Sequence, residues 1–200
     1  MAATFIDAPW YLPPVTSVLL VPPAEEPLTL AQAKLRAGLD WPDGDPRDDL
    51  MQDFIAAARA QVELDTGLAL LTQTRGITFH ESAAWSAESG YVPLPMQTLP
   101  LQSLTDPNGN PATFTTGFER RRAVARLTSS FTPGMWTAVA GWEDAAALRQ
   151  QAPGLVQAVG LLVAHFATVG RDAVIVGTIA TPNPLGYDEC INPYRLVTLA

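Results

Sequence analysis

Apolar residues return at helical intervals in several separate stretches of the chain. The clearest stretch predicts a helix over 47–66, because its apolar positions form one stripe along a helical surface. Asp45 can cap the start of this helix, Pro46 suits its first position, and Gly67 can end it. The stripe consists of Leu50, Met51, Phe54, Ile55, Ala58 and Val62. The charged residues expected mostly off the stripe are Asp53, Arg59 and Glu63.

Further helices are predicted on either side of this one in the sequence. Thr29 and Gln32 match the capping box, which predicts a short helix over 28–38 with Lys34 away from its apolar side. Residues 153–169 are apolar around almost the whole circumference of a helix, which predicts a helix packed on several sides. A short helix over 143–151 is expected to precede it.

The hydrophobic pattern changes between residues 71 and 142. Residues 72–79 have strand composition, and the stretch 91–104 is interrupted by prolines, as in short edge strands. The segment 106–110 (DPNGN) predicts a turn. Alternation then places four residues on one side of a strand: Trp136, Ala138, Ala140 and Trp142.

Prolines punctuate both ends of the chain and favour extended backbone there. Residues 18–21 form either a short strand or an arm laid on a neighbour. We therefore predict an α+β protein with a mainly helical core of antiparallel helices and a small β-rich insert. The predicted regions are an extended N-terminal arm (1–27) and one domain (28–200), comprising the helical core (28–70 and 143–170), the β-rich insert (71–142) and an extended C-terminal tail (171–200).

Composition and charge narrow the class of protein. With 48% hydrophobic and 16% charged residues, a chain of 200 residues can bury a core and is not disordered throughout. Its net charge of −8 has the wrong sign for holding nucleic acid through phosphates, although DNA can slide past an acidic surface. The apolar run near 155–169 is shorter than the ~20 residues that span a bilayer. No secretory signal and no membrane partner are expected.

The sequence offers little catalytic chemistry. Cys190 is the single cysteine, which excludes an intramolecular disulfide and a zinc site made of cysteines. His165 and Cys190 could act as a nucleophile pair only if the fold brought them together. In the acidic loop, Asp43-Gly44-Asp45 hints at a calcium loop, but no glutamate falls at the required place, and carboxylates at a helix start explain the cluster without a metal. We expect no catalytic residues, no cofactor and no metal.

Candidate contact residues lie in one basic run and near the N-terminus. Arg120, Arg121 and Arg122 form the only basic run, which is either a solvated hairpin or a charged loop that meets a neighbour's acidic surface or lines part of a pore. Trp10 and Tyr11 lie in the proline-rich arm, where an extended segment can order on a partner.

The order of several short motifs resembles the head–tail connector (adaptor) proteins of tailed bacteriophages, a family with relatives in prophages and gene transfer agents. The similar segments, each weak alone, are 21–34 (VPPAEEPLTLAQAK), Ile55-Ala56-Ala57-Ala58-Arg59, Thr66-Gly67, 69–70 (AL), 72–74 (TQT), parts of 153–171 including Leu161-Leu162-Val163-Ala164-His165-Phe166, and the ending Pro184-Leu185-Gly186 with Pro193-Tyr194-Arg195. The resemblance covers most of the chain after about residue 18, and the first seventeen or so residues depart from it.

The resemblance implies a structural virion protein without enzymatic activity. Such proteins form a ring, expected to be a dodecamer, below the portal; they join head to tail and continue the channel for double-stranded DNA, which passes without specific binding. The implied partners are further copies of the chain, the portal protein and a stopper or tail protein, with assembly in the bacterial host cytoplasm. The resemblance directs the segment around Pro193, Tyr194 and Arg195 towards the portal.

Two alternatives stay open from the sequence. The chain could be another phage structural protein, such as a stopper or a tail-completion protein, with partners on the tail side only. It could also be a small soluble enzyme whose site is assembled from scattered residues in a concave pocket.

Overall fold

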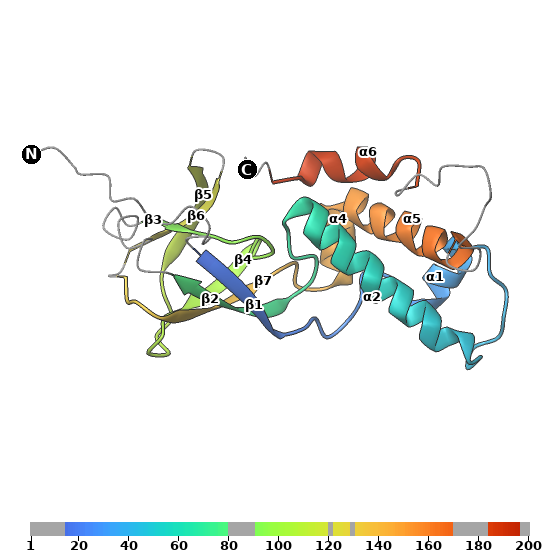
Figure 1. The fold of residues 1–200 in the computed structure, drawn as a ribbon, viewed down its shortest axis with the longest axis horizontal. Coiled ribbons are helices and arrows are strands. Elements are labelled where there is room, and N and C mark those ends of the chain that lie inside the picture. Colours follow the sequence, from blue (N-terminus) through green and yellow to red (C-terminus); the bar gives the residue numbers. More distant parts are fainter. Residues whose placement is uncertain (1–14, 80–90, 120–121, 129–130, 170–183, 197–200) are drawn as a thin grey trace, which may run out of the picture.

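Helices and strands separate into the two ends of an elongated molecule (Figure 1). The computed structural model describes residues 15–79, 91–119, 122–128, 131–169 and 184–196. The fold is α+β, as the sequence predicted for the class, with about 39% of the described residues in helices. The expected mainly helical core is only partly right, because a second core lies between two β-sheets.

The helical end is built around one buried helix. The helix α5 (Pro153–Val169) packs against α1 (Leu30–Arg36), α2 (Arg47–Thr66), α4 (Ala145–Gln151) and α6 (Tyr187–Ile191). Its nearly continuous apolar surface explains this central place, since every side meets another element. Leu155, Val159 and Leu162 are buried in the resulting core.

The helix α2 differs from the sequence prediction in which residues it buries. Its buried stripe contains Met51, Ile55, Ala58 and Val62, whereas Leu50 is largely exposed and Phe54 is half-buried. The helix spans the predicted residues 47–66, but Pro46, not Asp45, flanks its start and is not its first helical residue. Gly67 ends it in the left-handed conformation, as expected.

Two antiparallel sheets form the other end. One sheet has the order β1-β2-β7-β4 and the other β3-β6-β5. The strands of the first are β1 (Val15–Val21), β2 (Gln73–Phe79), β7 (Met135–Ala140) and β4 (Leu101–Thr105). Those of the second are β3 (Tyr91–Pro93), β6 (Arg122–Leu127) and β5 (Phe114–Glu119).

The sheets share a core because their strands present alternate residues to each other. Trp136 and Ala138 are buried, as the alternation predicted, and they pack with residues of both sheets, including Ile77 and Leu127. The Trp136 ring stacks on Phe131 with 5.7 Å between ring centroids, and its Nε1 donates to the Thr132 carbonyl at 2.8 Å. The predicted turn at 106–110 joins β4 to the second sheet.

The two ends of the chain carry more regular structure than predicted. Residues 15–21 form β1, which pairs along β2 as an edge strand, so the alternative of a short strand is the one the structure adopts. The C-terminal tail is not extended throughout, because α6 is followed by a 3₁₀ helix, η2 (Asn192–Tyr194). Burial of Tyr187 and Ile191 against the helical core drives this local folding.

The junction between the ends is tight. Where the chain leaves β7, Gly141 has a left-handed φ of 108°, and a Cβ atom there would collide with the Leu71 carbonyl. Only glycine fits this crossing, because it has no Cβ and tolerates positive φ. The neighbouring residues Leu71 and Trp142 form a parallel bridge.

Candidate functional site: interaction surfaces

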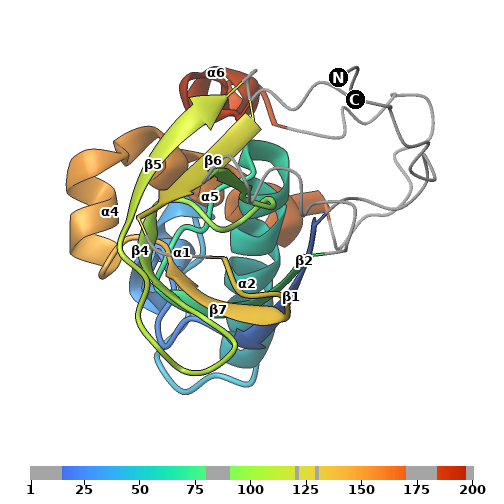
Figure 2. The same ribbon diagram turned by 90° about the vertical axis from the view of Figure 1, so that its left-hand side faces the viewer.

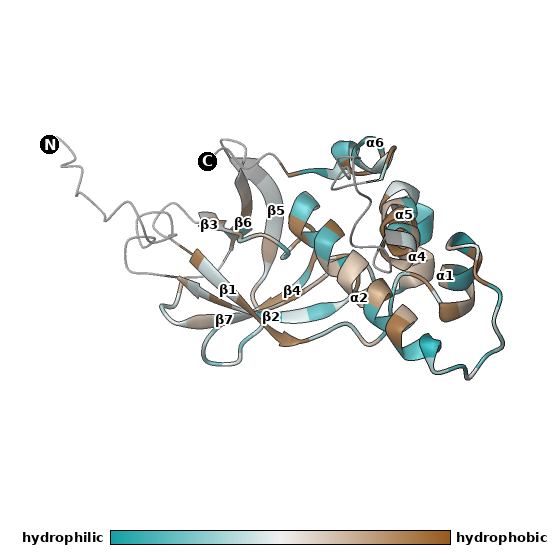
Figure 3. Cartoon of the chain, turned by 45° about the vertical axis from the view of Figure 1, so that its right-hand side comes forward, coloured by the Kyte–Doolittle hydropathy of each residue, from teal (hydrophilic) through white to brown (hydrophobic). Residues whose placement is uncertain are grey.

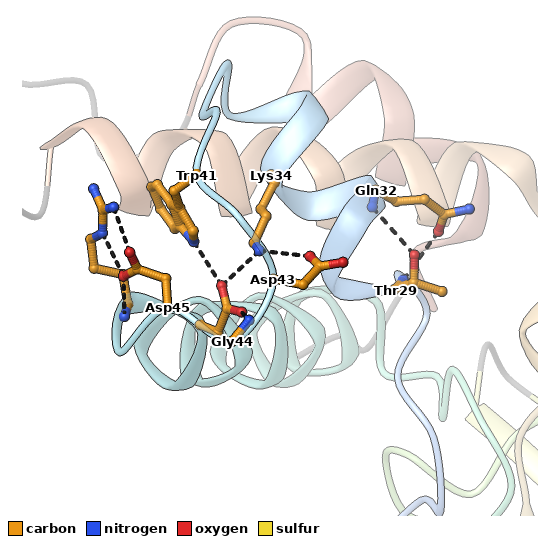
Figure 4. Close-up of polar contacts among 9 residues, drawn as sticks. Thr29, Gln32, Lys34, Trp41, Asp43, Gly44 and Asp45 are labelled. Atoms are coloured by element: carbon orange, nitrogen blue, oxygen red, sulfur yellow. Dashed lines mark hydrogen bonds and ion pairs between the residues drawn. The ribbon is translucent and has the colours of Figure 1, made fainter.

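The acidic loop before α2 is a polar network inside the chain (Figure 4). The Lys34 ammonium lies 2.8 Å from the Asp48 carboxylate and 3.1 Å from that of Asp43. Asp48 also accepts hydrogen bonds from the Trp41 indole at 2.7 Å and from the Gly44 amide at 2.8 Å. Lys34 is therefore buried, contrary to the sequence expectation, because its charge is compensated by these carboxylates.

The electrostatics of this loop follow from the same contacts. The hydrogen bond with Lys34 is the largest cause that lowers the pKa of Asp48, and it raises the pKa of Lys34 in turn. Arg47 donates two side-chain hydrogen bonds to Asp45, both at 2.7 Å, and holds the pKa of that carboxyl well below its usual range. These carboxylates lie at the start of α2, where Asp45 accepts a hydrogen bond from the Arg47 amide at 2.9 Å, and they form ion pairs within the chain.

A second charged network lies where helices meet strands. Glu63 is buried and accepts hydrogen bonds from the Leu70 amide at 2.9 Å, the Gln73 amide group at 3.3 Å and the Arg59 guanidinium at 3.1 Å. Arg59 also pairs with Glu26 at 2.8 Å. The sequence placed Glu63 mostly off the buried face; the structure buries it because it links α2 to the start of β2.

Burial dominates the charge state within this network. Desolvation raises the pKa of Glu63, although the Leu70 amide, Arg59 and Arg75 favour its charged form. Burial lowers the pKa of Arg75, while the Glu63 charge acts in the opposite direction. The Nε of Arg75 has no hydrogen-bond partner among the described residues.

The candidate chemical residues do not form a reactive group in the described part of the chain. His165 lies half-buried on α5 beside Phe166, with 6.2 Å between ring centroids, and Cys190 packs half-buried on α6 against the helical core. Within the described ranges, no cluster of three or more His, Cys, Asp or Glu side chains could hold a metal ion. No described helix is long and apolar enough to cross a bilayer.

The C-terminal candidates lie together on the helical end. Tyr194 is half-buried against α5, since a Cβ on Gly154 would approach its ring to 2.9 Å. Pro193 is exposed, and the exposed Arg195 pairs with Asp188 at 2.9 Å. The Leu196 amide donates to the Thr66 carbonyl at 2.9 Å, which ties the segment to the end of α2. The segment is therefore fixed on the helices and presents Pro193 and Arg195 outward.

The other candidate contact residues are mostly outside the described ranges. Trp10, Tyr11, Arg120 and Arg121 are not described, and Arg122 begins β6 opposite Glu119 of β5.

Exposed apolar side chains mark two further surfaces, one on β1 and one beside α2. Residues 18–21 of β1 are each between 43% and 55% exposed, and Leu50 lines an apolar hollow of about 200 Å³. The other residues around this hollow are Leu39, Trp41, Arg47, Met51, Phe54 and Ala167. Composition could not reveal these surfaces, because exposure depends on which strand becomes an edge.

The fold and these surfaces define an elongated α+β subunit with helical and β ends. Chains of gene transfer agent (GTA) particles are similar to it in structure. A chain from the virion of the native GTA particle is 18% identical with a TM-score of 0.60, and the match covers 92% of this chain and 97% of that one. A chain from the neck of the empty GTA particle, computed with C6 symmetry, is 21% identical with a TM-score of 0.59. A chain from the neck of the native particle, computed with C12 symmetry, is 20% identical with a TM-score of 0.55.

The two neck matches each cover 93% of this chain and 97% of the other. No family model matches the chain, and no curated protein matches it. At these identities the similarity establishes a shared fold over nearly the full length.

Proposed function

We propose that this chain is a structural virion protein that forms a ring in the neck of a phage-like or gene transfer agent particle. It sits between portal and tail as a head–tail adaptor, joins the two, and continues the DNA channel. The observation that carries this proposal is the near-complete match in both directions to chains of GTA necks. A shared fold alone does not define function, but here the order of sequence motifs points to the same class of assembly.

The symmetry of the matched necks supports a ring of copies. Those necks were computed with C6 and C12 symmetry, and a dodecamer suits both because twelve is divisible by six. An elongated subunit with different surfaces on its two sides can close such a ring through heterologous contacts. The proposed partners are neighbouring copies, the portal protein and a stopper or tail protein; the proposed location is the virion, with assembly in the bacterial host cytoplasm.

The electrostatic character of the chain suits a channel that does not hold its DNA. The net charge of −8 repels phosphates, and a genome passing an acidic lumen is not retained by ion pairs. The C-terminal segment is proposed to face the portal, with Pro193 and Arg195 as its exposed residues. No catalytic step, cofactor or metal is part of this function.

The copy number of the chain relative to portal protein in purified particles tests the proposal. We expect a ratio near one to one, measured by quantitative mass spectrometry against isotope-labelled peptides of both proteins. In a tail-deficient mutant, an adaptor should stay on the heads, whereas a tail-completion protein should be missing from them. Absence of the chain from particles would refute the proposal and return attention to an enzymatic role.

A further inference from the structure

The strand β1 has an apolar edge without a partner in the described chain. It pairs with β2 on one side only, and Val18, Leu19, Leu20 and Val21 are 54%, 43%, 45% and 55% exposed. Soluble proteins normally protect such edges with charges, prolines or bulges that turn the strand away. The sequence of β1, VTSVLLV, contains no charge and no proline, although its pairing shifts register near its end.

The outer face of the same sheet extends this apolar surface. Gly76 of β2 has no side chain, and the side chains of Val18, Leu20 and Met135 fill the space beside it. A Cβ atom at Gly76 would lie 3.1 to 3.4 Å from these side chains. Met135 is itself 50% exposed. We call Val18, Leu20, Val21 and Met135 the β1 patch. In Figure 3, hydrophobic colour marks much of β1 on the outside of the sheet.

A second free edge lies on the opposite side of the molecule. In Figure 2, β5 and β1 lie on opposite sides of the β end. The strand β5 has six residues, pairs only with β6 among the described strands, and exposes Thr115 and Thr116. The remaining edges fit less well: β3 has three residues, and β4 is partly covered because the Ala112 amide donates to the Leu104 carbonyl at 2.8 Å.

We propose that β1 of one copy pairs along β5 of the next copy, so that edge-to-edge contacts run around the ring. This inference rests on the proposed ring function and names its subunit contact. Strand addition supplies main-chain hydrogen bonds to two unpaired edges of similar length, seven and six residues. It brings the β1 patch against the uncharged segment 114–118 (FTTGF), so burial does not desolvate charge there. Two different surfaces on opposite sides are what a closed heterologous ring requires.

Paired cysteines in assembled particles test the contact. Val18→Cys or Leu20→Cys is combined with Thr115→Cys or Thr116→Cys in a Cys190→Ser background, because residues opposite each other across strands have Cβ atoms roughly 5 Å apart. Mild oxidation of purified particles should give a ladder of cross-linked oligomers for at least one pair. The single-cysteine variants should give no ladder.

Separate outcomes distinguish this inference from the proposed function. If the variants enter particles but no pair forms a ladder, the β1–β5 contact is wrong while the neck function stands. Cross-linking of position 18 or 20 to the portal protein would equally overturn it and assign the β1 patch to the portal. If the wild-type chain is absent from particles, both proposals fall.

Charge placed on the edge gives a second test that does not depend on cross-linking. The double variant Val18→Lys/Leu20→Lys should lower incorporation into particles at least tenfold while the isolated chain keeps its thermal unfolding curve. Leu35→Lys is the matched control, since Leu35 is 81% exposed on α1, away from the β end. Equal incorporation of both variants would contradict the contact.

Discussion

The helical end and the β end of this molecule bury their apolar residues with different degrees of completeness. The helical end surrounds α5 with other helices, and its buried charges Lys34 and Glu63 meet partners from the same chain. The β end also has a core, but its outer strand β1 leaves four consecutive apolar side chains exposed. The helical end therefore covers its own apolar residues, whereas the β end leaves an apolar surface that the proposed neighbouring copy would cover.

The largest expected effect concerns the junction of the two ends. Gly141→Ala should lower the free energy of unfolding by about 3 kcal/mol or more, because a Cβ would collide with the Leu71 backbone at a left-handed φ. Urea unfolding of the purified chain measures this loss. Gly117→Ala is the control, since a Cβ at Gly117 meets nothing within 4 Å and its φ is not left-handed. Similar stabilities of the two variants would mean that the junction can relax.

Truncation of one leucine at each end compares the two regions directly. Leu162→Ala should cost about 2–5 kcal/mol, because Leu162 is buried between the helices and its loss leaves a cavity. Leu20→Ala should cost less than about 1 kcal/mol in the isolated chain, because Leu20 is already 45% exposed. Guanidinium unfolding of both variants checks the contrast. An equal cost would show that the β1 edge is covered in the isolated subunit.

The C-terminal helix offers a smaller effect within the helical end. Tyr187→Phe removes the hydrogen bond from the Tyr187 hydroxyl to Asp65 at 2.7 Å, and should cost roughly 0.5–1.5 kcal/mol. Faster hydrogen exchange in α6 should accompany this loss. Tyr194→Phe serves as its partner variant, because no hydrogen bond of the Tyr194 hydroxyl is observed within the described residues. If Tyr194→Phe lowered the free energy of unfolding more than Tyr187→Phe, η2 and not α6 would anchor the tail.

The smallest expected effect is a change in pH dependence at the junction. Since burial raises the pKa of Glu63 above 4.5, its usual value, the folded chain binds that proton more tightly than the unfolded chain. This contribution to stability is present below pH 4.5 and is lost as the pH rises through the raised pKa. Glu63→Gln should remove this contribution to the slope of the unfolding free energy against pH. Unfolding midpoints measured from pH 4 to pH 8 check it, and identical slopes would show that Glu63 titrates normally.

The sequence predicted the helical elements well because their signals are local. The capping box at Thr29, the apolar circumference of 153–169 and the glycine after α2 depend on residues a few positions apart. The strand alternation at Trp136 and Ala138 was equally local. The motif order also pointed to phage-like particles, in agreement with the fold of the matched GTA chains.

Long-range contacts decided what the sequence could not. From the sequence, Glu63 and Lys34 both look like surface residues. In the structure, β2 brings Gln73 beside Glu63, and the acidic loop brings Asp48 to 2.8 Å from Lys34. Likewise, residues 15–21 form β1 and residues 187–191 form α6 only because they pair or pack with distant segments.

The sequence by itself determined the main helices, the acidic character and a resemblance to one class of assembly proteins. Only the tertiary structure decided that β1 is an edge, that β5 lies on the opposite side, and that an apolar patch is left exposed between β1 and Met135. The physical reason is that capping and periodicity act over a few residues, whereas exposure is set by which distant segments cover a strand.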